Sequence, residues 1–107
     1  MSGIIVDGEK NYLIALKKEC EKHIRHLKMQ LKELMKRQRN CENSIDLLED
    51  RLRTATVGKK KEIKREIMNI DRELREIEES RKSVNEEIDR QRDEYQEKVK
   101  DLPDCLF

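Results

Sequence analysis

Aromatic side chains are almost absent from this chain of 107 residues: Tyr12, Tyr95 and Phe107 are the complete set, and there is no tryptophan. Hydrophobic residues make up 35% of the sequence and charged residues 46%. Such a composition does not suit a broad globular core, but it suits a narrow seam between long helices. We therefore expect one coiled-coil domain, with disorder as the competing interpretation.

Residues that break helices are also scarce, since the chain has one proline and three glycines. Between Glu9 and Asp101 the helical pattern breaks once, at residues 54–58, where three β-branched residues precede Gly58. Glycine is common just after a helix end, and a helix rarely continues up to Pro103. We expect an apolar tail (1–8), a helix (9–55), a turn (56–58), a second helix (59–102) and a C-terminal tail (103–107).

Targeting and cofactor signals are missing as well. The net charge is +1, the longest apolar run is Tyr12–Leu16, and the first residues lack the basic and apolar regions of a signal peptide. Three cysteines without metal-ligand spacing predict neither a disulfide framework nor a metal site. We expect no cofactor, no membrane insertion and an intracellular protein, in the cytoplasm or the nucleus.

The feature that is present in abundance is a heptad repeat. In the first helix the apolar steps alternate between four and three residues, and the second helix repeats the pattern with few polar interruptions. A sustained a/d repeat predicts a coiled coil. The a positions are Ile24, Leu31, Gln38, Ile45, Leu52, Ile67, Leu74, Arg81, Ile88 and Tyr95, and the d positions are Leu27, Leu34, Cys41, Leu48, Ala55, Ile63, Ile70, Ile77, Val84 and Gln91.

The heptad phase slips by one residue at the break, which leaves two interpretations. One is a long parallel dimeric rod with a skip residue. The other is a reversal that pairs Leu48 with Ile67 and Ile45 with Ile70. Residues 17–39 hold nine Lys/Arg against three Glu, whereas residues 76–98 hold nine Asp/Glu against five Lys/Arg. This complementarity favours an all-α antiparallel two-helix coiled-coil hairpin.

Several apolar residues fall outside the repeat, namely Met29, Met35, Leu47 and Met68. Two helices alone bury only one seam, so a second contact surface is expected. The sequence predicts a four-helix bundle, formed by a homodimer or higher oligomer or with the helices of other coiled-coil proteins.

The open end of the hairpin is the first candidate site, because folding at residues 57/58 brings both apolar chain ends together. We expect either a docking patch for a partner or a cap that covers the helix ends. The candidate partner-binding residues are Ile4, Ile5, Val6, Tyr12, Ile14, Leu16, Val99, Leu102, Leu106 and Phe107.

Polar residues at seam positions are the second candidate. Gln38, Arg81 and Gln91 interrupt the apolar repeat, and buried polar residues at such positions specify register or partner. The alternative is that their side chains extend past a thin seam into solvent.

The third candidate is basic and comprises Lys59, Lys60, Lys61, Lys64 and Arg65, together with residues 28–39. Either segment is suited to phosphate groups or an acidic partner surface. The alternative is a solvated helix face, because no aromatic residues interleave for base stacking.

Groups for catalysis are not assembled in the sequence. His23 and His26 are spaced for one helix face but lack further ligands, and Cys41 lies on the seam without a base nearby. The composition is similar to that of small coiled-coil subunits of cytoskeletal, chromosomal or tethering complexes. We expect a non-enzymatic scaffold protein that mediates protein–protein assembly, with binding of nucleic acid or an acidic surface as the alternative.

Overall fold

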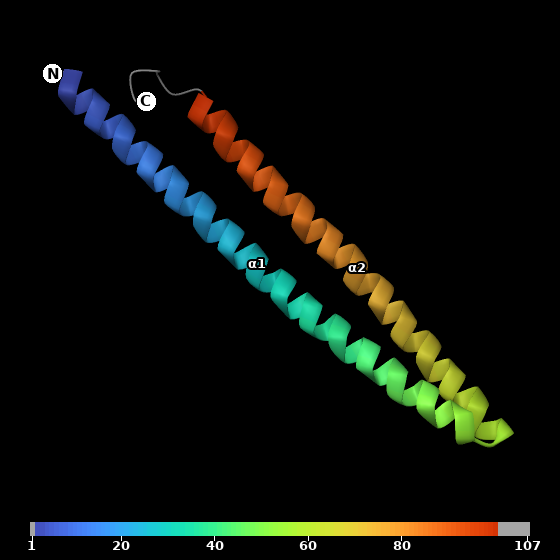
Figure 1. The fold of residues 1–107 in the computed structure, drawn as a ribbon. Helices are drawn as coiled ribbons and strands as arrows, with labels where there is room; N and C mark the ends of the chain where they lie inside the picture. Colours follow the sequence, from blue (N-terminus) through green and yellow to red (C-terminus); the bar gives the residue numbers. More distant parts are fainter. Residues whose placement is uncertain (1, 101–107) are drawn as a thin grey trace. The chain divides into compact units, whose positions relative to one another are not determined.

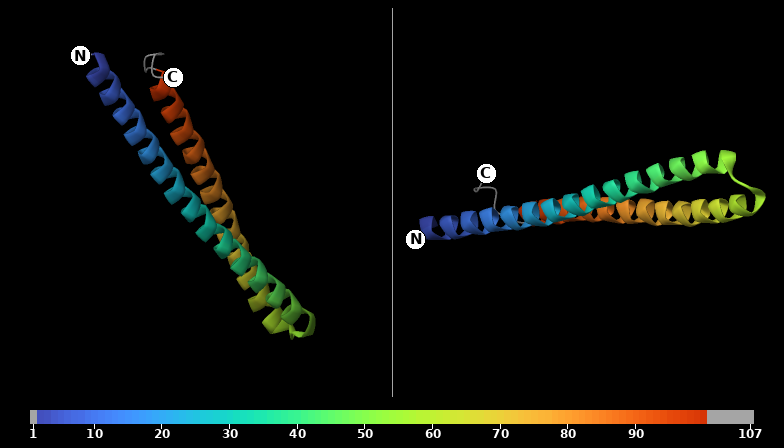
Figure 2. Two further views of the ribbon diagram at one scale, coloured as in Figure 1. Left: turned by 60° about the vertical axis from the view of Figure 1, so that its left-hand side comes forward. Right: turned by 90° about the horizontal axis from the view of Figure 1, so that it is seen from below.

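The chain forms two long helices that pack against each other as a hairpin (Figure 1). The computed structural model describes the backbone of residues 2–100 and the side chains of residues 10–100. Helix α1 covers Ser2–Thr54 and helix α2 covers Val57–Lys100, and the described residues contain no strand. The two helices run in opposite directions (Figure 2). The expected all-α hairpin is confirmed.

The helix bounds differ from the expected ones. Residues 2–8, predicted as a tail, lie within α1, and the connection consists of Ala55 and Thr56 instead of residues 56–58. The backbone N–H of Lys60 donates to the carbonyl of Thr56 at 2.8 Å, so α2 already begins at this point. Threonine is a favoured residue directly before a helix. The predicted end of the second helix at residue 102 lies outside the described residues, as does the tail 103–107.

Gly58 has a different role from the expected one. It lies in the first turn of α2, and none of the described glycines has a positive φ. Gly58 therefore does not end α1 in the left-handed conformation typical of a glycine after a helix.

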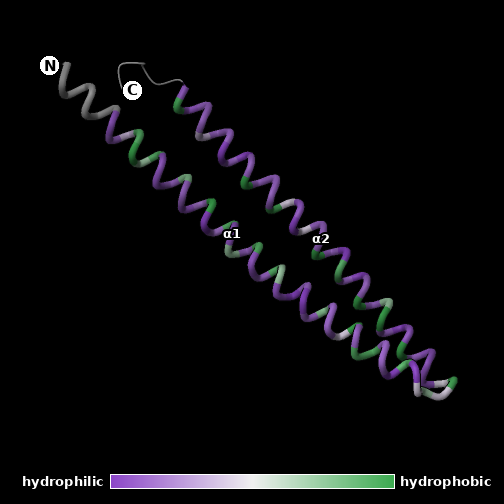
Figure 3. Tube along the Cα trace, in the orientation of Figure 1, coloured by the Kyte–Doolittle hydropathy of each residue, from purple (hydrophilic) through white to green (hydrophobic). Residues whose placement is uncertain are grey.

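The a/d seam is where the two helices meet, and Figure 3 shows the apolar residues recurring along each of them. Every a and d residue predicted from Ile24 to Tyr95 is buried or half-buried. Four of the apolar residues are almost fully enclosed: Cys41, Leu48, Ile77 and Ile88. The others stay partly exposed, because two helices can cover a seam from only two sides.

The packing divides into two compact units, which we describe separately. Unit 1 joins Met1–Met29 to Val84–Phe107, and unit 2 comprises Gln30–Ser83. Unit 2 keeps the strict heptad spacing on both helices, and it contains Cys41, Leu48 and Ile77.

Unit 1 departs from the heptad on both helices. On α1 the inward positions are Leu13, Leu16, Cys20 and Ile24, whereas Lys17, which the heptad places on the seam, is exposed. On α2 they are Ile88, Gln91, Tyr95 and Val99. Both sets follow steps of three, four and four residues, and a repeat of about 11 residues locally unwinds a left-handed supercoil.

Candidate interaction surfaces

A polar layer crosses the seam of unit 2. Arg81 Nη1 donates to Gln38 Oε1 at 2.6 Å, and Gln38 Nε2 donates to Glu42 Oε1 at 3.0 Å. Gln38 and Arg81 are half-buried, so the hydrogen bond between them is partly shielded from water, whereas the one from Gln38 to Glu42 is exposed. The structure thus joins two of the three predicted polar seam residues in one contact between the helices.

Next to this layer lies the buried thiol of Cys41. Burial raises the pKa of Cys41, and the neighbouring Glu73 carboxylate raises it further by its charge and a hydrogen bond. Arg37 acts in the opposite direction and also forms an ion pair across the helices with Glu73, at 3.3 Å between Nη2 and Oε1. A thiol with a raised pKa is a poor nucleophile, and Cys41 serves as an apolar seam residue.

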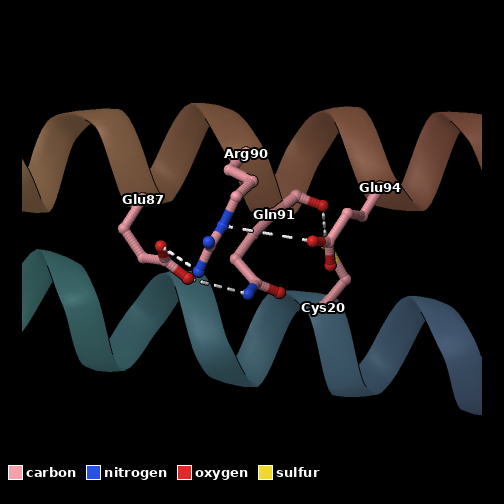
Figure 4. A network of polar contacts seen from close by, with 5 residues as sticks. All are labelled: Cys20, Glu87, Arg90, Gln91 and Glu94. Carbon is pink, nitrogen blue, oxygen red and sulfur yellow. Dashed lines mark hydrogen bonds and ion pairs between the residues drawn. The ribbon is translucent and has the colours of Figure 1, made fainter.

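The third polar seam residue, Gln91, belongs to a network in unit 1 (Figure 4). Its side-chain amide donates to Glu87 Oε1 at 3.1 Å, and its backbone carbonyl accepts a weak hydrogen bond from Cys20 Sγ at 3.7 Å. Glu87 also pairs with Arg90, which lies 4.0 Å from Glu94. These hydrogen bonds lower the pKa of Glu87, with the larger effect from Arg90.

Shallow depressions flank the seam of unit 1. One of them has a volume of about 400 Å³ and is lined by Lys22, His23, His26, Leu27, Glu87 and Gln91. The two predicted histidines thus share one depression. Within residues 10–100, no group of three His, Cys, Asp or Glu side chains is arranged to hold a metal ion.

The structure describes part of the predicted apolar end. Tyr12 and Ile14 are each 53% exposed, and Leu16 and Val99 are half-buried. The beginning of α1 and the end of α2 belong to the same unit, as the hairpin requires. Ile4, Ile5 and Val6 lie in α1, but their side chains are not described; Leu102, Leu106 and Phe107 lie outside the described residues.

The apolar residues predicted to lie off the seam do so. Met29, Met35, Leu47 and Met68 are between 48% and 66% exposed. Their heptad positions are f, e, c and b respectively, so they do not line up as the second continuous stripe that a long helix–helix contact needs.

The basic residues at the start of α2 are all exposed. Lys59, Lys60, Lys61, Lys64 and Arg65 have no ion-pair partner within 4 Å in the part of the chain that the structure describes. Segment 28–39 differs, because Arg37 is engaged with Glu73.

One arrangement was missed by the sequence predictions. From Lys61 onward, the b and f positions of α2 in unit 2 are all exposed; they carry Lys61, Arg65, Met68, Arg72, Arg75, Glu79 and Lys82. In unit 1 the same positions of α2 are also exposed; they carry Glu86, Asp89, Asp93, Gln96 and Lys100. The predominance of cations in the first set and of carboxylates in the second becomes visible when charges are grouped by heptad position.

A scan against family models, a search of curated proteins and a search of solved structures each found no match for this chain. Within the described residues, neither helix has a stretch that is long and apolar enough to cross a membrane. Function has to be inferred from the surfaces of the hairpin itself.

Proposed function

We propose that this protein is a non-enzymatic coiled-coil scaffold that assembles with further helices, from a second copy or from another coiled-coil protein. The contact surface is the open end of the hairpin in unit 1. Association of two hairpins there produces a local four-helix bundle, a common way to bury an incomplete seam. The subunit would serve within a larger cytoskeletal, chromosomal or tethering complex.

The observation that carries this proposal is the exposure of Tyr12 and Ile14 beside half-buried Leu13, Leu16 and Val99. Two large apolar side chains that stay more than half exposed at one end of a highly charged hairpin support an interaction site there. Among the side chains of residues 10–100, the other exposed large apolar residues are the scattered Met29, Met35, Leu47, Val57 and Met68.

Sedimentation equilibrium of the purified chain tests the proposal. We expect a mass above that of the monomer at micromolar concentration, and this mass should persist at ~1 M salt because apolar contacts do not depend on charge. Ile14→Asp should shift the protein to monomer. Met29→Asp, at a comparably exposed methionine of the same unit, is the matched control and should leave the mass unchanged. A fully helical monomer at all micromolar concentrations would refute self-assembly.

Binding of nucleic acid or an acidic surface through segments 28–39 and 59–65 is a second candidate function. It is favoured by the five unpaired cations between Lys59 and Arg65. Binding to duplex DNA should then weaken steeply with salt, and reversal of Lys59–Lys61 to Glu should abolish it. DNA binding that is absent at low salt would exclude this candidate.

A further inference from the structure

One flank of the seam near the start of α1 combines apolar and basic residues, and we call it the Ile14 face. At about 100° per residue, five positions between residues 4 and 17 share a sector about 100° wide: Val6, Lys10, Leu13, Ile14 and Lys17. Asp7 and Glu9 fall just outside this sector on either side. Ile14 is 53% exposed, and the two exposed lysines have no ion-pair partner within 4 Å among the described residues.

Helix α1 extends past the described end of α2 within unit 1 (Figure 1). Cys20 and Tyr95 line the same two depressions, and Leu16 shares one of them with Lys98. Because the helices run in opposite directions, Lys100 lies level with the region around Ile14. The part of α1 before this level is about 18 Å long, and no described residue of α2 lies opposite it.

The segment outside the described residues begins at this level. It comprises residues 101–107, of which Leu102, Cys105, Leu106 and Phe107 are apolar. A proline disfavours helix in the residue before it, so Pro103 favours an extended segment. Seven extended residues span up to about 23 Å, which is enough to cover the 18 Å of α1 that lies beyond α2.

The charges of this segment are complementary to those of the Ile14 face. Its charged side chains are Asp101 and Asp104, whereas those of the face are Lys10 and Lys17. Two residues three apart in an extended chain are separated by about 10 Å, as are two residues seven apart in a helix. The spacing therefore allows both carboxylates to pair with a lysine at the same time.

We propose that residues 101–107 lie on the Ile14 face of the same chain and cap it, so that a partner helix has to displace them. The inference rests on the proposed function, because it states how the open end is regulated. The occupant is a segment of this chain because it starts beside the face, matches the length of α1 left uncovered and carries the complementary charges.

The strength of the cap determines its effect on assembly. Ordering the segment costs conformational entropy, which opposes the apolar contacts and the two exposed ion pairs. The face therefore alternates between a covered and an uncovered state. If the segment covers the face in about 90% of molecules, the apparent affinity for a partner helix is about tenfold lower than the affinity of the uncovered face.

Disulfide trapping tests the contact within one chain. Cys105 supplies one thiol, and Lys10→Cys supplies the other within the Ile14 face. Gly8→Cys is the matched control, since it lies at nearly the same level on the opposite side of α1 and a free segment would reach both positions alike. At ~1 μM protein we expect the link to position 10 to form at least about tenfold faster, because a disulfide needs Cα atoms within about 7 Å. Peptide mapping by mass spectrometry identifies the linked pair.

Deletion of residues 101–107 tests the effect on assembly. Sedimentation equilibrium should show self-association that is about tenfold tighter than that of the full chain, because the uncovered face no longer has a competitor. Asp101→Lys with Asp104→Lys should act in the same direction at low salt, since each carboxylate then faces a lysine with like charge. Asp89→Lys with Asp93→Lys makes the same change of net charge elsewhere in unit 1, and it should associate like the wild type.

The possible outcomes separate this inference from the proposed function. Equal rates of disulfide formation at positions 8 and 10 overturn the inference. In a chain that self-associates, so does a deletion that leaves association unchanged or weakens it; the proposed scaffold function then still stands if Ile14→Asp abolishes association. Selective trapping at position 10 in a full chain and a deletion variant that are both monomeric would support the cap and refute self-assembly.

Discussion

Glu87 contacts both the exposed Arg90 and the seam residue Gln91. Hydrogen bonds from Arg90 and Gln91 hold the pKa of its carboxyl group below the ordinary value, so the folded state favours the ionised form. The stabilisation is therefore present above the pKa of an unfolded glutamate, about 4.3, and is lost as the pH falls through the lowered pKa of the folded state.

Replacing Glu87 by Gln should remove this pH dependence. We expect a lower Tm than that of the wild type at pH ~7 and little difference at pH ~2, where the wild-type carboxyl is protonated as well. Circular dichroism melts at both pH values measure the difference. Glu86→Gln changes a neighbouring exposed carboxylate without these hydrogen bonds, and an equal effect in that variant would contradict the assigned cause.

Gly58 is a second residue whose role can be tested, and it lies at the start of α2. It lies in the first helical turn without a positive φ, and a Cβ built on it meets no atom within 4 Å. Gly58→Ala should therefore raise the free energy of unfolding by about 0.5–1 kcal/mol, because alanine loses less backbone entropy in a helix. Urea denaturation measures the change. A lower free energy of unfolding in this variant would instead indicate a left-handed glycine that ends α1.

At the scale of the helices, the polar layer between Gln38 and Arg81 interrupts an otherwise apolar seam. Replacing both residues by Leu should raise the free energy of unfolding by about 1 kcal/mol, since an apolar pair of suitable size often stabilises more than a partly buried polar one. The same change should broaden the distribution of oligomers, because a polar layer penalises other registers and partners.

Native mass spectrometry and urea denaturation of the Gln38→Leu/Arg81→Leu variant check both expectations. Gln38→Leu alone is the control: it leaves the Arg81 guanidinium half-buried without its acceptor and should destabilise relative to the double variant. A double variant that is less stable than the wild type, or that keeps a single oligomeric state, would show that the layer acts differently.

The seam could be predicted from the sequence because its steps of three and four residues have no other regular explanation. The residue of α1 that faces the seam near the start of the helix could not be predicted in the same way. Leu16 and Lys17 are adjacent, and a repeat of 3.5 residues places Lys17 on the seam, whereas a repeat of about 3.67 residues places Leu16 there. The role of Gly58 was missed for a similar reason, since glycine suits both a helix end and a first turn. The contact from Arg81 to Gln38 depends on side-chain rotamers, which periodicity does not specify.

In the molecule as a whole, stability is limited because the hairpin buries few apolar side chains. Four apolar side chains of the described part are almost fully buried, and the remaining seam residues keep partial exposure. A single narrow seam provides marginal stability for a chain of this size. Association that covers Tyr12, Ile14 and the flanking residues would therefore stabilise the folded chain as well as join it to a partner.

This coupling predicts a melting temperature that depends on protein concentration. For a folded state that self-associates, raising the concentration a hundredfold should raise the Tm by roughly 5 °C, because the unfolded chains do not associate. Ile14→Asp should flatten this dependence, because it disrupts the apolar contact at the open end. A Tm that does not depend on concentration in the wild type would mean that the hairpin is stable without self-association. Its exposed apolar end would then bind a different chain.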